Sequence, residues 1–522
     1  MDRGGREVRP PQDTVISRRW FLERMAWITT AAAGAEALVP RPVMGAERTS
    51  SYLREIPISI NTRQQVGELT ELTISETVDF LRRGVVSPED LVRAHVDRID
   101  RYDQFYRAYA GRPSLDALLA SASSGTDGSY QPLKGVCLAP KDNFYTTDML
   151  TEGGSLVFEG FQPHYDATAV ASIRSAGGLI IGKAQMGNLA GGRAQVYGTT
   201  IPTTRNAWTP NDVNYSPAGS SSGTGTAVAA RMAVAGLGTQ TGGSVVGPGN
   251  AQGLTCIKPT FGRISLHGVI PLSYTRDHVG PMARNVMDAA ILLQVLAHPD
   301  PNDPRTKGLP PAPNYVGSAA PTLGLNAPVR WPTRVGVFPG WSDPGDEGVA
   351  RMRADFLRDL ESMGNVQLVG EITLPEQWEE LTSQPLGGSH GDPTAFFIEP
   401  LRRDVRLFGD RLPRFLNGML QSADTYVKVQ QARMLLLHRI QTQLFNQCDV
   451  VLTEGSGAFD GTGMPVLCMP IGFDTDPGSG MSVPRGVNLA APPFGEERLF
   501  AVAAAWQART DYHTVRPEDP VG

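Results

Sequence analysis

The sequence lacks the features that mark metal, redox and nucleic-acid-binding proteins. Only four cysteines occur in 522 residues, none in a Cys-x-x-C pair, and no two of the eight histidines have ligand spacing. Acidic residues outnumber basic ones by 53 to 47, so there is no basic surplus for nucleic acid. We therefore expect no metal site and no nucleic-acid partner. We expect buried free thiols at Cys137, Cys256, Cys448 and Cys468.

The N-terminal apolar run is too short for a stable membrane anchor. It covers residues 27–39 and is interrupted by Glu36, whereas a membrane-spanning helix needs about 18 to 20 apolar residues. Two consecutive arginines followed by Trp-Phe-Leu precede it within residues 17–22, a pattern that resembles a twin-arginine export signal. We expect residues 1–46 to be this signal and the protein to be exported, to the periplasm or the exterior. The alternative is a disordered basic tail.

From residue 69 onward the chain alternates helical patterns with short apolar strand patterns. Residues 133–140 have strand character and lead directly into Lys141, while 167–175 and 179–182 predict a helix followed by a strand. Such alternation favours an α/β fold layered around a sheet. Further expected elements are a surface connection over 299–333, a strand over 334–338 with a helix through 360, a long helix over 422–447, and a strand and loop region over 450–475.

The composition predicts one large domain. The chain is 41% hydrophobic and 19% charged, an ordinary balance for a globular protein with a large core. We place this domain over residues 69–510, between an N-terminal extension (47–68) and a C-terminal tail (511–522).

A stretch rich in serine and glycine, residues 216–244, allows several interpretations. A linker would be polar throughout, but residues 227–237 form an apolar segment. A phosphate-binding loop would need a following lysine or a third glycine at dinucleotide-loop spacing, and neither occurs. Residues 219–223 match the G-x-S-x-G pattern of a nucleophile elbow centred on Ser221, but loop residues stand where that elbow needs a strand.

What remains is a pair of hydroxyl-bearing loops, 220–222 and 241–244, which we expect a helix between them to bring together. A serine hydroxyl is too weak an acid to attack a carbonyl unaided, so it needs a neighbouring base. A lysine can be that base if burial lowers its pKa, and Lys141 is the lysine best placed for burial. The alternative is that Lys141 forms a structural ion pair with Asp142.

These segments strongly resemble the amidase signature family. The resemblance is carried by residues 216–244 and by their continuation through 253–254 and 257–265, and it covers most of residues 69–507. It implies a single α/β domain with a mixed, mostly parallel sheet covered by helices on both faces, and a catalytic core over about residues 130–290. Other matching segments are 132–136 with 141–142, 154–155, 176–177 with 181–183, 277–284, 463–465, 470–472 and 495–499.

The resemblance also implies a Ser-cisSer-Lys triad. Lys141 matches the family's base, Ser220 its bridging serine in a cis peptide with Gly219, and Ser244 its nucleophile. Met186 and Ser221 are expected to contact substrate, and the mechanism needs no metal or organic cofactor. The oxyanion hole would be formed by the backbone amides of Thr241, Gly242, Gly243 and Ser244.

The chain departs from the family pattern around the nucleophile. Gln240 and Val246 stand where the family usually has aspartate and arginine, so both charges are missing together, which avoids an unpaired buried charge. Ser222 replaces a glycine, and Gly187 replaces the usual acidic residue after Met186. We expect a rearranged support for the nucleophile.

The resulting hypothesis is an exported amidase that cleaves a small, mostly uncharged acyl or aryl amide to acid and amine through an acyl-enzyme. An esterase using the same triad and an amidase-like binding protein without turnover are the alternatives. A tRNA-dependent amidotransferase subunit would need cytoplasmic partners, which an exported protein does not meet. The expected partner is a small-molecule amide, and a homodimer stays an open alternative to a monomer.

Overall fold

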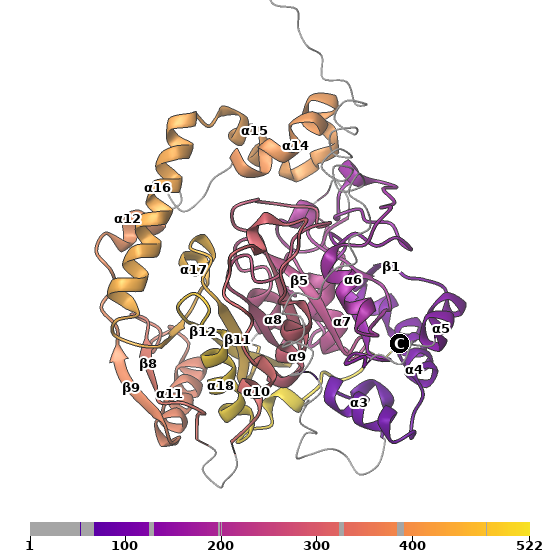
Figure 1. The fold of residues 1–522 in the computed structure, drawn as a ribbon, viewed down its shortest axis with the longest axis horizontal. Helices are drawn as coiled ribbons and strands as arrows, with labels where there is room; N and C mark the ends of the chain where they lie inside the picture. The colour runs from indigo at the N-terminus through magenta and orange to yellow at the C-terminus, as the bar shows by residue number, and fades with distance from the viewer. Residues whose placement is uncertain are drawn as a thin grey trace, which may run out of the picture. The chain divides into compact units, whose positions relative to one another are not determined.

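A computed structural model describes most of the chain after residue 66 (Figure 1). The described residues are 53, 67–124, 130–196, 199, 201–322, 328–383, 391–476 and 478–521. They all fall within one unit, Arg48–Gly522. The expected export signal (1–46) and nearly all of the expected extension (47–68) lie outside the described residues.

A ten-stranded mixed sheet forms the centre of this unit, in the order β3-β2-β5-β7-β6-β11-β12-β10-β8-β9. The expected α/β fold with a large mixed sheet flanked by helices is confirmed. A separate two-stranded sheet pairs β1 (Tyr109–Gly111) with β4 (Lys183–Ala184). The central strands are β2 Cys137–Pro140, β3 Leu179–Ile180, β5 Ala235–Gln240, β6 Thr255–Lys258, β7 His278–Ala283, β8 Thr333–Val337, β9 Val366–Glu371, β10 Val450–Thr453, β11 Val466–Thr475 and β12 Ser482–Ala490.

The expected predominance of parallel pairing in this sheet is wrong. Parallel pairs occur at its two ends, β3-β2-β5 and β10-β8-β9. All pairs from β5 through β7, β6, β11 and β12 to β10 are antiparallel. Parallel neighbours need a crossover, which helices supply between β2 and β3 and between β8 and β9, whereas β11 and β12 join through a short turn.

Helices cover both faces of the sheet. Successive residues of a strand point to opposite faces, and they pack into two different apolar clusters. On β10, Val450 and Leu452 pack into one cluster and Val451 into the other. The first cluster includes α9, α10 and α18, and the second includes α4, α7 and α8. The helices are α3 Ile74–Arg82, α4 Pro88–Tyr106, α5 Leu115–Ser123, α6 Thr168–Ser175, α7 Ser222–Ala229, α8 Val246–Gln252, α9 Val286–Leu296, α10 Tyr315–Ala319, α11 Glu347–Ser362, α12 Trp378–Thr382, α14 Gly391–Arg403, α15 Leu412–Leu420, α16 Ala423–Arg439, α17 Gly457–Gly461 and α18 Glu496–Gln507.

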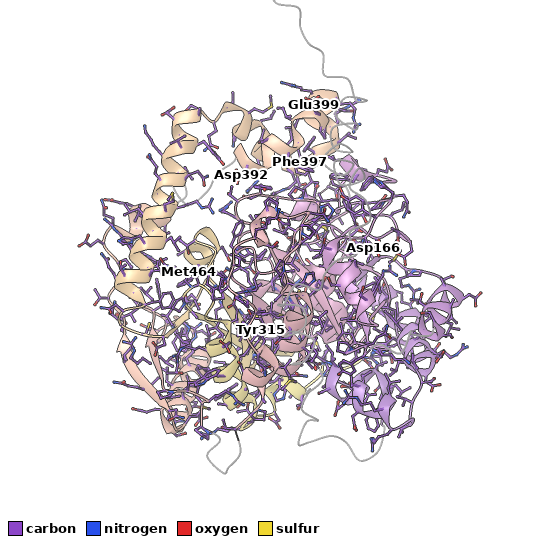
Figure 2. The ribbon with its side chains drawn as sticks, in the orientation of Figure 1. Asp166, Tyr315, Asp392, Phe397, Glu399 and Met464 are labelled. Atoms are coloured by element: carbon purple, nitrogen blue, oxygen red, sulfur yellow. The ribbon has the colours of Figure 1, made fainter. Side chains whose placement is uncertain are left out.

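Residues 391–439 form a helical cap of α14, α15 and α16, joined by the short helix η5 (Val405–Arg411). Figure 1 shows α14 and α15 set apart from the strands, while α16 runs back toward α12. The cap has its own apolar cluster, which includes Phe397 on α14 (labelled in Figure 2). Leu189 and Ile270, from loops of the main body, join the same cluster. The cap therefore packs on two specific loops of the domain.

Among the helices of the described residues, none combines the length and apolar character needed to cross a bilayer.

Candidate active site

Lys141 lies at the carboxyl end of β2 and is completely buried. Its Nζ donates to Ser220 Oγ at 2.7 Å and to Thr239 Oγ1 at 2.8 Å, with the Thr239 carbonyl oxygen at 3.3 Å. Asn143 Nδ2 also donates to Thr239 Oγ1, at 3.0 Å. The lysine is therefore held between one serine hydroxyl and neutral oxygens of β5.

The neighbouring carboxylate, Asp142, is paired with another lysine. Lys183 Nζ lies 3.2 Å from Asp142 Oδ1, and both side chains are buried. Asp142 also accepts from the backbone N–H of Glu152 at 3.1 Å. The alternative that Lys141 forms a structural ion pair with Asp142 is wrong, because successive side chains around the end of β2 point to different sides.

Burial lowers the pKa of Lys141 to about 7, although the Asp277 carboxylate partly opposes the shift. A lysine at its ordinary pKa of about 10.4 would be neutral in only about one molecule in 2,500 at pH 7. A pKa this close to neutrality makes the neutral amine far more abundant at that pH. Lys141 can thus accept a proton from Ser220 under ordinary conditions.

The two serine loops meet above β5. The peptide bond between Gly219 and Ser220 is cis. A Cβ placed on Gly238 of β5 would lie 2.7 Å from Ser221 Oγ and 3.0 Å from Val245 Cγ2, so both loops approach this glycine closely. Ser244 follows β5, two residues before the start of α8, and is 8% exposed. No hydrogen bond joins Ser220 to Ser244 in the described part of the chain.

The expected oxyanion donors are not equivalent in the structure. The N–H of Gly243 donates to Asp460 Oδ2 at 2.9 Å, so in this structure it already has an acceptor, and its expected role in the oxyanion hole stays a prediction. The N–H groups of Thr241, Gly242 and Ser244 have no protein acceptor among the described residues. Gly243 differs from the other three donors because the carboxylate of Asp460, on α17, lies next to its N–H.

Gln240 explains the missing charges around the nucleophile. Its Oε1 accepts from the N–H groups of Val245 (2.8 Å) and Val246 (3.0 Å), where the first turn of α8 needs an acceptor. Its Nε2 donates to Asp460 Oδ1 at 2.7 Å. Asp460 also accepts from Ser456 Oγ and lies 3.7 Å from Lys258 Nζ. An aspartate or glutamate at position 240 would face this carboxylate, so the amide suits its neighbour.

Position 187 has glycine in place of the family's acidic residue because no side chain fits there. Its N–H donates to the Ser220 carbonyl oxygen at 3.1 Å. A Cβ on Gly187 would overlap the carbonyl oxygens of Gly191 and Gly192, and a Cβ on Gly219 would overlap the same Gly192 oxygen. The loop 187–192 thus touches the cis peptide segment at positions where no side chain fits.

Met186 and Ser221, the expected substrate contacts, are both buried. Met186 is 1% exposed and packs with Ala190 and Leu272. Ser221 has no exposed surface, and its hydroxyl lies 3.5 Å from the Thr239 carbonyl oxygen. In this structure the Ser221 hydroxyl therefore faces strand β5, and its expected contact with substrate stays a prediction. The elbow hypothesis is also wrong, because loop residues precede this serine.

Three site residues carry no functional signal in the sequence. Thr239 holds Lys141, Asp460 holds the Gly243 N–H, and Asp277 accepts from Thr241 Oγ1 at 2.5 Å. Asp277 lies within a segment that resembles the family, which is the one hint available. Within the described ranges, no group of three or more His, Cys, Asp or Glu side chains could hold a metal ion.

Gln240→Glu should destabilise the protein by about 2 kcal/mol, because a second buried carboxylate would face Asp460. Adding Asp460→Asn should restore most of the loss, since the new amide can donate to Glu at 240. Urea unfolding of both single variants and the double variant measures this coupling. Additive losses would contradict the Gln240–Asp460 interaction.

Asp142→Asn should cost about 3–5 kcal/mol of stability, because it leaves the buried ammonium of Lys183 without its carboxylate. Lys141→Met is the matched control, since it removes a buried lysine that has no carboxylate partner. Its loss should be smaller in the same urea unfolding experiment. A larger loss for the Lys141 variant would show that Asp142 is not committed to Lys183.

Comparison with known proteins gives a consistent result. The family model described as Amidase matches residues 90–384. The chain is similar to the putative amidase AmiD of Mycobacterium tuberculosis (strain ATCC 25618 / H37Rv), at 30% identity over 485 residues, covering 86% of this chain and 96% of that protein. It is also similar to a subunit of the glutamyl-tRNA(Gln) amidotransferase of Roseiflexus sp. (strain RS-1), at 32% identity over 509 residues, covering 87% and 99%. Among solved structures, the native peptide amidase of Stenotrophomonas maltophilia superimposes with a TM-score of 0.71 at 26% identity, covering 89% of this chain and 99% of that one. With the family model spanning more than half of its length, this chain belongs to the amidase signature family.

Proposed function

We propose that this protein is an amidohydrolase that cleaves the C–N bond of a small carboxylic amide through Lys141, Ser220 and Ser244. The observation that carries the proposal is the buried Lys141 Nζ, 2.7 Å from Ser220 Oγ and free of the adjacent carboxylate. A neutral amine in that position has a proton to accept and no counter-ion that would keep it charged.

The first half of the reaction forms an ester with Ser244. Neutral Lys141 takes the proton of Ser220, and Ser220 takes that of Ser244 as Ser244 Oγ bonds to the amide carbonyl carbon. The negative charge that develops on the carbonyl oxygen would be stabilised by backbone N–H groups of Thr241, Gly242 and Ser244. Each such donor is worth roughly 2.7 to 4 kcal/mol in a transition state.

The second half releases both products. As the C–N bond breaks, the proton held on Lys141 returns through Ser220 to the leaving nitrogen, so an amine departs rather than an amide anion. Water then attacks the acyl carbon of the Ser244 ester, and its proton passes through the same relay to Ser244 Oγ as the bond from that oxygen to the acyl carbon breaks and the acid leaves. Protonation of the leaving group is needed for an amide more than for an ester, because an amide anion leaves far less readily than an alkoxide.

We infer further that the enzyme acts on linear amides outside the cell membrane. The sequence supports export through its two consecutive arginines followed by an apolar run, residues 17–39. The relatives include a peptide amidase and an amidotransferase subunit, so the family resemblance alone does not select among amides.

The direct test is labelling of the purified protein by a fluorophosphonate, with the modified residue located by mass spectrometry. We expect the label on Ser244, with loss in Ser244→Ala and at least tenfold slower labelling in Lys141→Ala. Ser221→Ala is the matched serine control and should label at the parent rate. Label on Ser221, or none on any serine, would refute the proposed triad.

The rate of amide hydrolysis should rise with pH through about pH 7. Burial lowers the pKa of Lys141 to about 7, so the neutral base accumulates above that pH and protonation removes it below. A profile of kcat/KM from pH 5 to 10 measures this, and Lys141→Ala should abolish the limb near pH 7. A parent optimum in the acidic range would contradict a neutral lysine base.

A further inference from the structure

Two arginines of the helical cap lie beside the loops that build the active site. Arg411 ends η5, and Arg414 lies in the first turn of α15. Both are only partly exposed. The segment that carries them is fixed by Asn188, whose Nδ2 donates to the Phe408 carbonyl oxygen (3.3 Å) and to Asp410 Oδ1 (3.0 Å).

Arg411 reaches the active-site side through the loop 187–192. Its guanidinium lies directly against Gly191, where a Cβ would overlap the Cζ and Nη2 atoms. The same loop touches the catalytic segment, since Gly187 N–H donates to the Ser220 carbonyl oxygen at 3.1 Å. One short loop thus separates this guanidinium from the bridging serine.

Arg414, three residues further along the chain, lies close enough to Arg411, Arg276 and Asp277 for their charges to interact with its own. Burial lowers the pKa of Arg414 to about 10, and the charges of Arg411 and Arg276 contribute, while Asp277 opposes them. Asp277 in turn accepts from Thr241 Oγ1 at 2.5 Å, on the expected oxyanion loop. The cap therefore places the Arg411 guanidinium against the loop 187–192, with the positive charge of Arg414 close to it.

Neither guanidinium has a hydrogen bond or ion pair with any residue that the structure describes, and the buried Nε atoms of both arginines lack a partner. The nearby carboxylates are already occupied by other donors. Asp277 accepts from Thr241 and from the N–H groups of Leu272 and Ser273, and Asp410 accepts from Asn188.

Another carboxylate and another arginine of the cap, Asp392 and Arg433, differ from Arg411 and Arg414 because both have hydrogen-bond partners within the protein. Asp392, labelled in Figure 2, accepts from Ser273, Thr275 and Tyr426. Arg433 donates to Thr275, Gln430 and the Gly461 carbonyl oxygen, so its hydrogen bonds are used within the protein. Unlike those of Arg433, the guanidinium N–H groups of Arg411 and Arg414 are not hydrogen-bonded to any described residue.

Two neighbouring, partly buried cations without hydrogen-bonded anions are unfavourable until an anion joins them. A guanidinium fork matches a carboxylate in geometry and can donate two parallel hydrogen bonds. We propose that Arg411 and Arg414 bind a carboxylate on the amide substrate, away from the bond that is cleaved. This rests on the proposed function, and it replaces the mostly uncharged substrate expected from the sequence with an amide that carries one carboxylate.

The test uses Ser244→Ala protein, so that ligands bind without turnover, and isothermal titration. The probes are ω-amide monocarboxylates with one to four methylenes, succinamate among them, each compared with the neutral alkyl amide of equal length, such as butyramide. At least one carboxylate should bind roughly tenfold or more tightly than its neutral counterpart, the scale of one charge-assisted hydrogen bond. Arg411→Gln and Arg414→Gln should each remove most of that difference.

Arg406→Gln is the matched control, because Arg406 lies in the same segment, is exposed and pairs with Asp404. It should leave the preference unchanged. Gly191→Ala offers an independent variant that displaces the Arg411 guanidinium without removing a charge, and it should also weaken carboxylate binding. Equal binding of every carboxylate and its neutral counterpart, or a preference that survives both arginine substitutions, would overturn the proposal.

Turnover separates this proposal from the catalytic one. With the parent protein, the ratio of kcat/KM for succinyl p-nitroanilide to that for butyryl p-nitroanilide should exceed one and should fall in both arginine variants. Carboxylate binding by titration together with no label on Ser244 would refute the triad and support the anion site. Labelling of Ser244 with no carboxylate preference would support the triad and refute the anion site.

Discussion

One buried contact, from Lys141 Nζ to Ser220 Oγ at 2.7 Å, sets the requirements for the rest of the site. A lysine must leave water for its pKa to fall, but a carboxylate beside it would keep it protonated. The fold meets both conditions by pairing Asp142 with Lys183 and by surrounding Lys141 with the oxygens of Thr239 and Ser220. The Asp142–Lys183 ion pair thus keeps the adjacent carboxylate from raising the pKa of Lys141.

The loop after β5 is also held by a side chain from a distant part of the sequence. Its backbone is fixed from outside the serine-glycine stretch by Asp460, which accepts from Gly243 N–H and from Gln240. Gln240 in turn accepts from the first turn of α8, so one amide side chain links the strand, the loop and the helix. Where the family pattern has two charges, this chain thus has an amide that bridges the Asp460 carboxylate and the start of α8.

Local patterns were enough to predict several elements, including β2, which leads to Lys141, but not the strand β5 that precedes Ser244. The apolar run over 133–140 contains β2, the pattern over 167–175 matches α6, and the expected strand over 334–338 lies within one residue of β8. The long helix expected over 422–447 stops at Arg439 and continues as the π-turn Ile440–Leu444. The antiparallel centre of the sheet was not predictable, because it pairs strands such as β6 and β11 that are about 200 residues apart, and no local period encodes such partners.

The family, the α/β architecture and the lysine and serines expected to react could all be inferred from the amino-acid order, because they depend on residue types at fixed positions along the chain. Three further features became visible only in the folded protein: which lysine pairs with Asp142, which loop amide Asp460 occupies, and the burial of Ser221. The position of Arg411 and Arg414 beside the catalytic loops belongs with them. The physical reason is that burial and charge pairing depend on distances between residues far apart in sequence, and these distances exist only after the sheet, the loops and the helical cap have packed together.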